Sequence, residues 1–147
     1  MWPLSSRVRQ LMDSAWSAQL VGRTVQAIEQ PDGRGCLVVL SGGYVVQIDC
    51  FWRLLSEHRV ALTSRDDGEL FGRSSPVRAV PELLAAIRGL EITSMQVAPR
   101  TADLTIGFDG AFVQVIAESS GYEAWQVHGP LGTLAIGQGG GRVVGPA

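Results

Sequence analysis

A repeat within the sequence is the feature that most constrains the fold of this chain. A shift of 67 positions, as from Gly22 to Gly89, places residues of similar character on one another in the first part of each copy. The aligned pairs are Gly22 and Gly89, Val25 and Ile92, Ile28 and Met95, Leu37 and Leu104, Val39 and Ile106, Gly43 and Gly110, Gln47 and Gln114, and Ile48 and Val115. From Trp52 onwards the shift is 73, and the pairs are Trp52 and Trp125, Gly68 and Gly141, Leu70 and Val143, Phe71 and Val144, and Gly72 and Gly145. We therefore expect a single domain over residues 1–147, built from two repeats (about 5–72 and 78–145) that are related by an approximate twofold axis.

Each repeat is expected to contain a β-hairpin. Gly42-Gly43 and Asp109-Gly110 lie between runs rich in β-branched residues, and both suit the two-residue type I′ turn. Such turns would place apolar pairs on one face of each hairpin, namely Leu37 with Ile48, Val39 with Val46, Leu104 with Val115, and Ile106 with Val113. The other face would be mixed and partly solvated, with Cys36, Val38, Gln47, Thr105 and Gln114.

A helix is expected at the start of each repeat. Ser5 or Ser6 can cap a helix that runs to about Leu20, and Pro81 suits the first turn of a shorter helix that ends before Gly89. Five or six short strands should follow each helix, in the first repeat at about residues 24–30, 36–41, 44–50, 51–55, 59–63 and 69–71. The predicted fold class is α+β, with about 10–12 mostly antiparallel strands and two helices in a pseudo-twofold arrangement.

The second repeat carries a recognisable set of segments. These are LTIGFDGAFVQV at 104–115, YEAWQV at 122–127 and the glycine run Gly139-Gly140-Gly141. They resemble a family of small uncharacterised bacterial proteins, common in actinobacteria, which is similar in pattern to immunity-like proteins of polymorphic toxin systems. The first repeat has FWRL at 51–54 where the second has YEAWQV. The resemblance implies this architecture and an association with toxin neutralisation, and it supplies no catalytic residue.

The amino-acid composition indicates the class of protein and excludes some kinds of partner. Apolar residues make up 46% of the chain and charged residues 18%, which is typical of a globular protein. With 14 acidic and 12 basic residues and no basic stripe, nucleic acid is not an expected partner. No apolar run approaches the roughly 20 residues of a membrane span, so we expect a cytoplasmic protein that does not bind membranes.

The reactive side chains form no familiar catalytic or metal-binding motif. Cys36 and Cys50 should be free thiols, because the predicted register points them to opposite faces. His58 and His128 belong to no HExxH or HxH group, so neither a metal nor a cofactor is predicted. The segments Asp66-Asp67-Gly68 and Gly139-Gly140-Gly141 are better explained as turns than as a calcium loop or a phosphate loop.

A site is expected near the six extra residues of the second copy, the inserted loop, which lie between about Ala117 and Tyr122. An insertion breaks the symmetry of the repeat, and loops on a rigid scaffold often carry binding residues. The candidate partner-binding or ligand-binding residues are Glu118, Tyr122, Glu123 and Arg142. Trp16, Trp52 and Trp125 are expected to pack in the core.

We predict a non-catalytic protein-interaction module, immunity-like in type, that binds a partner protein such as a toxin-like effector or associates with itself. The alternative is a small-ligand-binding protein or an enzyme that uses the cleft between the two repeats.

Overall fold

The computed structural model describes residues 15–33 and 35–145 and confirms the α+β class. One sheet has six strands in the order β1-β2-β3-β9-β10-β11, and the other has five in the order β5-β4-β8-β7-β6. The strands are β1 (Val25–Glu29), β2 (Cys36–Leu40), β3 (Tyr44–Ile48), β4 (Phe51–Ser56), β5 (Arg59–Thr63), β6 (Ser94–Val97), β7 (Leu104–Phe108), β8 (Ala111–Ile116), β9 (Glu123–Gly129), β10 (Gly132–Gln138) and β11 (Arg142–Val144). The helices are α2 (Ala15–Ala18) and α3 (Ala79–Ile87). All strand pairs within both sheets are antiparallel.

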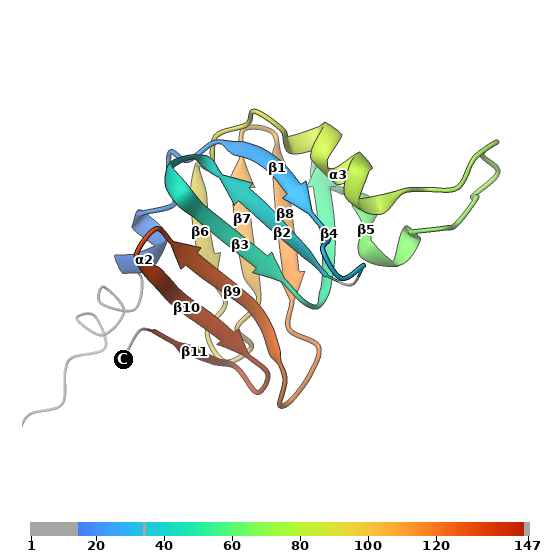
Figure 1. Cartoon of the computed structure of the whole chain (residues 1–147). Helices are drawn as coiled ribbons and strands as arrows, with labels where there is room; N and C mark the ends of the chain where they lie inside the picture. Colours follow the sequence, from blue (N-terminus) through green and yellow to red (C-terminus); the bar gives the residue numbers. More distant parts are fainter. Residues whose placement is uncertain (1–14, 34, 146–147) are drawn as a thin grey trace, which may run out of the picture.

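The two sheets pack face to face, with the helices at opposite sides (Figure 1). Val46 and Ile48 of the six-stranded sheet and Val113 and Val115 of the five-stranded sheet are fully buried in one common core. Helix α3 adds Leu83 and Ile87 to this core and ends before Gly89, as its apolar spacing predicts. The first helix is predicted from Ser5 or Ser6 to about Leu20. Its part before residue 15 lies outside the described residues, and α2 belongs to the part that is described.

The three tryptophans predicted to pack in the core do so. Trp125 is fully buried and donates a hydrogen bond from Nε1 to the Ala102 carbonyl oxygen, 2.7 Å away. The Trp16 ring packs against it with a centroid separation of 5.6 Å, and Trp52 is buried on β4. These buried rings therefore contribute to the stability of the fold.

Strand pairing repeats between the two halves of the chain. Ile48 pairs with Trp125 in one sheet, and their counterparts at shifts of 67 and 73, Val115 and Trp52, pair in the other. The β9–β10 hairpin has the register of the β4–β5 hairpin and shares its bulge, and it has a second bulge, between Gly137 and Gln138, that the β4–β5 hairpin lacks.

Where the halves meet, the hydrogen bonds also come in equivalent pairs. The Gly22 amide donates to the Ile92 carbonyl at 2.8 Å, and the Gly89 amide donates to the Val25 carbonyl at 2.9 Å. These pairings support the predicted repeat. The duplication itself stays a prediction, which superposition of the two halves would test.

The predicted register of the first hairpin is wrong by one residue. Leu40 pairs with Tyr44, so the loop is the three-residue 3-10 turn Ser41–Gly43 rather than Gly42-Gly43 alone. Consequently Cys36, not Leu37, lies opposite Ile48. The buried residues of β2 are Cys36, Val38 and Leu40, whereas Leu37 and Val39 are half-buried on the outer face.

The second hairpin has the predicted register. Leu104 pairs with Val115 and Ile106 with Val113 around the two-residue loop Asp109-Gly110. The predicted mixed face is not one surface, because Gln47 belongs to the six-stranded sheet while Thr105 and Gln114 belong to the five-stranded sheet.

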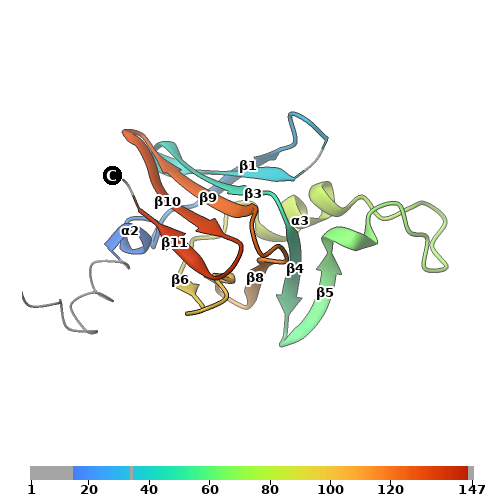
Figure 2. The ribbon, with the colours of Figure 1, turned by 90° about the horizontal axis from the view of Figure 1, so that it is seen from below.

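The predicted strand at residues 69–71 is also wrong. After β5 the chain forms a 3-10 helix, Ser64–Asp66, in which the Asp66 carboxylate accepts a hydrogen bond from the Thr63 amide at 2.9 Å. The segment Asp66-Asp67-Gly68 is thus a turn, but it does not join two strands. Residues 67–78 then form a long loop, here called the projecting loop. It extends away from β5 before α3 begins (Figures 1 and 2).

Candidate interaction surface

Of the four residues of the predicted site, Glu118 makes structural contacts with the first half of the chain. Glu118 Oε1 accepts a hydrogen bond from the Phe51 amide at 2.8 Å, and Oε2 forms an ion pair with Arg65 at 2.9 Å. Both partners belong to the first half of the chain. Glu118 therefore ties the start of the inserted loop to β4 and to the 3-10 helix that follows β5.

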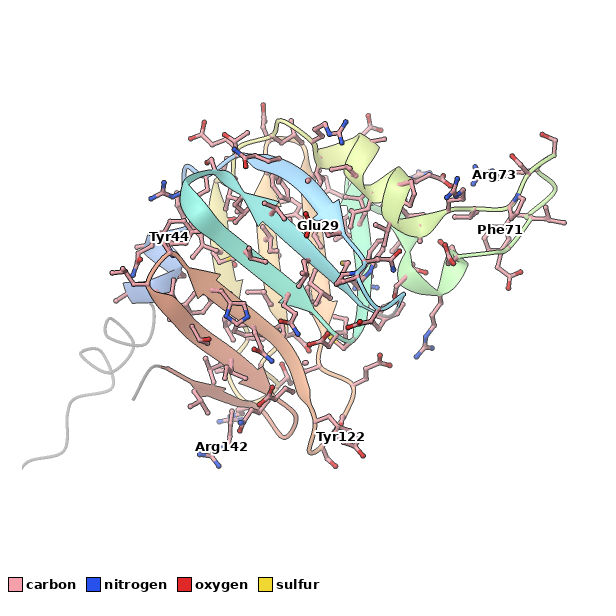
Figure 3. The ribbon with its side chains drawn as sticks, in the orientation of Figure 1. Glu29, Tyr44, Phe71, Arg73, Tyr122 and Arg142 are labelled. Carbon is pink, nitrogen blue, oxygen red and sulfur yellow. The ribbon has the colours of Figure 1, made fainter. Side chains whose placement is uncertain are left out.

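Glu123 and Arg142 lie on either side of the same residue of β10. Gln138 of β10 pairs with Glu123 on one side and with Arg142 on the other, so the two charged residues lie on strands that flank β10. Tyr122 is 83% exposed on the inserted loop, and Figure 3 shows it apart from Arg142. The four predicted residues therefore do not converge on one cleft.

The glycine run Gly139-Gly140-Gly141 allows the inserted loop to pack closely against the turn after β10. A Cβ on Gly139 would collide with the Ser119 carbonyl, and one on Gly141 would collide with the Arg100 carbonyl. Gly139 also donates its amide to the Tyr122 carbonyl at 2.7 Å. The glycines thus permit close backbone packing at the predicted turn between β10 and β11. The run is followed by strand β11, whereas a phosphate loop is followed by a helix.

An open cavity of about 340 Å³ lies beside Glu118. It is lined by Gln30, Gly33, Gly35, Asp49, Cys50, Phe51, Trp52, Ser64, Arg65, Asp67, Ala79, Val80 and Glu118. Several of its polar groups already hold the fold, since Ser64 Oγ accepts from the Trp52 amide at 3.1 Å and Asp67 Oδ1 accepts from the Ala79 amide at 2.9 Å.

The cysteine in this cavity is not activated. Burial, followed by the negative charges of Glu118 and Asp49, raises the pKa of the Cys50 thiol to about 12. Burial and then Asp49 raise the pKa of Cys36 to about 12 as well. Both cysteines are free, and both are neutral near pH 7, whereas a nucleophilic cysteine needs a lowered pKa. The predicted register that points the two thiols to opposite faces is wrong, because Cys36 lies opposite Ile48 on the buried face.

A second, larger cavity of about 890 Å³ lies between α2, β6 and β11. Its lining consists of Trp16, Ser17, Met95, Gln96, Val97, Ala98, Pro99, Thr105, Gly141 and Val143. None of these lining residues is ionisable, and none belongs to the predicted site. In the described part of the chain, no three His, Cys, Asp or Glu residues are grouped as a metal would require, and no helix has the length and apolar character to cross a membrane.

The most distinctive surface feature is an apolar pair on the projecting loop. Leu70 is 52% exposed and Phe71 is 69% exposed. Figure 3 shows Phe71 and Arg73 on this loop, well away from Tyr122 and Arg142. In the sequence this pair stands between Gly68 and Gly72, and its pattern predicts a short strand at 69–71 rather than an exposed loop.

The projecting loop is anchored at its base. The Gly68 amide donates to the Val77 carbonyl, and the Val77 amide donates to the Glu69 carbonyl, both at 2.8 Å. Val77 is buried, and Arg73 forms an ion pair with Glu82 of α3 at 3.2 Å. The loop is therefore a defined structural element that holds Leu70 and Phe71 in place.

The turn that carries Phe71 is strained. Phe71 has φ of +46° and Gly72 has φ of +79°, and the Arg73 amide closes the turn on the Leu70 carbonyl at 2.7 Å. A positive φ suits Gly72, but for a bulky residue such as Phe71 it costs about 1–3 kcal/mol. Such strain often marks a functional position, and here its effect is to present an aromatic ring to solvent.

Comparisons with protein-family models, with curated proteins and with solved structures found no match to this chain.

Proposed function

We propose that this protein is a non-catalytic protein-interaction module and that the projecting loop is its main contact surface. The observation that carries the proposal is the adjacent exposure of Leu70 and Phe71 on an anchored loop. Aromatic side chains dominate the energetics of protein interfaces. A loop that is already ordered also loses less conformational entropy when it binds.

Other exposed apolar side chains are a weaker basis for a binding surface. Tyr122 and the fully exposed Leu131 stand singly on separate loops, and scattered apolar residues are normal on protein surfaces. The alternative of a ligand-binding or catalytic cleft has less support, since the cavity beside Glu118 contains a neutral thiol and side chains engaged in structural hydrogen bonds. The immunity-like relationship and a toxin-like partner stay predictions.

Capture experiments with matched variants test the proposal. Tagged wild-type protein and the variants Phe71→Ser, Tyr122→Ser and Leu131→Ser are incubated with a lysate of the source organism, and bound proteins are quantified by mass spectrometry. Loss of Phe71 should reduce capture of the specific partner at least tenfold, whereas Leu131→Ser should leave it unchanged. Equal capture by the wild type and Phe71→Ser would contradict the proposal, and selective loss with Tyr122→Ser would move the contact to the inserted loop.

A further inference from the structure

The turn around Phe71 extends away from the part of the projecting loop that is bonded to the fold. Two backbone hydrogen bonds close the base of the loop at Val77. Beyond this base, residues 69–76 are all exposed. The Arg73 amide closes the turn on the Leu70 carbonyl at 2.7 Å. This last bond sets the shape of the turn, but it does not set the orientation of the turn relative to the rest of the fold.

An ion pair connects the turn to helix α3. Nη1 and Nη2 of the Arg73 guanidinium lie 3.2 and 3.3 Å from the two carboxylate oxygens of Glu82. Such a two-point contact fixes the orientation of the guanidinium as well as its distance. Arg73 follows Phe71 by two residues on the same loop (Figure 3). Because Arg73 also donates the amide that closes the turn, its ion pair orients the turn against α3.

Glu82 is itself held in place by its own helix. Its Oε2 atom also accepts a hydrogen bond from the Arg78 amide at 2.8 Å. This hydrogen bond, followed by the one from Arg73, lowers the pKa of the Glu82 carboxyl, so the group is ionised near neutral pH. The helix is anchored in turn, because Leu83 and Ile87 are buried in the core. The carboxylate is therefore a fixed point to which the exposed turn is attached.

The start of the projecting loop is attached to the same end of α3. Asp67 Oδ1 accepts a hydrogen bond from the Ala79 amide, in the first turn of the helix, at 2.9 Å. Asp67 precedes Phe71 in the chain, and Arg73 follows it. The loop is therefore attached to α3 on both sides of the exposed ring.

We propose that Glu82 is a positioning residue of the contact surface, which holds Arg73 and thereby presents Phe71 in the orientation that the partner binds. The proposal rests on the proposed function, because it names the residue that orients the projecting loop for its partner. Glu82 acts by reducing the number of conformations that the free loop adopts, which lowers the entropy lost on binding. The turn depends on such a restraint, because Phe71 has a positive φ, and strained conformations persist only where the surrounding structure fixes them.

Amide hydrogen exchange of the full chain, measured by mass spectrometry, tests the restraint in the absence of any partner. Glu82→Gln keeps an oxygen that can accept from the Arg78 amide but removes the charge that pairs with Arg73. Arg73→Gln removes the same ion pair from the side of the loop. Each variant should accelerate exchange over residues 69–75 about two- to fivefold, as expected for an exposed ion pair, and the double variant should exchange no faster than the single variants. Arg78→Gln changes another exposed arginine at the base of the loop and should leave the exchange unchanged.

The dependence of exchange on salt separates the ion pair from a general effect on folding. Salt screens exposed charges, so a higher salt concentration should accelerate exchange over residues 69–75 in the wild type. In Glu82→Gln the same increase in salt should have no effect on this segment. Unchanged exchange over residues 69–75 in both Glu82→Gln and Arg73→Gln would overturn the proposal.

Capture from the lysate relates the restraint to binding. Glu82→Gln and Arg73→Gln should each lower capture of the partner that Phe71→Ser loses by about two- to fivefold, and Arg78→Gln should capture like the wild type. Full capture of that partner by Glu82→Gln would overturn the proposal and leave the proposed function standing. If Phe71→Ser captures like the wild type, the proposed function fails and the role of Glu82 in binding fails with it, whereas accelerated exchange in Glu82→Gln would still show that Glu82 orders the turn.

Discussion

The substitution Trp125→Ala tests whether the Trp125 ring is part of the hydrophobic core. The indole is fully buried, packs against Trp16 and donates a hydrogen bond to the Ala102 carbonyl at 2.7 Å. Trp125→Ala would remove the ring from a site that cannot collapse easily, because β3 and β10 both pair with β9 at this position.

The expected loss of stability has two parts. Deleting a buried aromatic ring costs about 3–5 kcal/mol through lost burial and the cavity left behind. The Ala102 carbonyl, also fully buried, loses its indole donor, which adds about 1 kcal/mol. For a chain of this length the sum lowers the melting temperature by about 10–20 °C.

The free energy of unfolding is measured by thermal and urea unfolding for the wild type, Trp125→Ala, Trp125→Phe and Tyr122→Ala. Trp125→Phe keeps a ring but loses the hydrogen bond, so its stability should fall by about 1–3 kcal/mol. Tyr122→Ala, on the exposed loop, should change stability by less than about 0.5 kcal/mol. A Trp125→Ala protein that melts like the wild type would refute the assignment of this ring to the core.

Two further predictions concern the thiols and the inserted loop. Because the folded-state pKa values of Cys36 and Cys50 are raised from 9.0 to about 12, the stability that the neutral thiols confer is present below pH 9 and is lost as the pH rises towards 12. The melting temperature of the wild type should therefore fall more between pH 9 and pH 11 than that of a Cys36→Ala, Cys50→Ala double variant, and equal falls would contradict the assignment. Glu118→Ala should cost about 1 kcal/mol in chemical unfolding, because the Phe51 amide loses its acceptor, whereas Glu118→Gln should recover most of the loss. Identical stabilities of the two Glu118 variants would show that this hydrogen bond contributes nothing.

Much of the fold could be predicted from hydrophobic spacing and turn residues. Asp109-Gly110 specifies a two-residue turn, so the register of Leu104 with Val115 follows from the sequence. Gly42-Gly43 offers the same signal, yet Ser41 joins that loop as a third residue, and this moves every side chain of β2 to the opposite face. Two glycines in succession allow either loop, and sequence alone does not distinguish them.

The exposure of Leu70 and Phe71 on the projecting loop, where we propose the contact surface, could not be predicted for a related reason. Leu70 and Phe71 align with Val143 and Val144 of β11, so the pattern favours a short strand. Before this pair, the Asp66 carboxylate accepts from the Thr63 amide, a local contact of the kind that competes with strand pairing. Ser64 Oγ accepts from the Trp52 amide of β4, so β5 ends at Thr63. Of the four predicted site residues, Glu118 has a structural role that no sequence pattern indicated, because its partners Phe51 and Arg65 are distant in the chain.

Site-specific photo-cross-linking tests the central claim, that the projecting loop is the contact surface, most directly. A benzophenone amino acid is placed at position 71 or, as the matched exposed control, at position 131, and the protein is irradiated in cells of the source organism. The account predicts a discrete adduct from position 71 and none from position 131, and an adduct of twice the mass of the chain would identify the partner as a second copy. Equal yields from both positions, or no adduct from position 71, would contradict the claim.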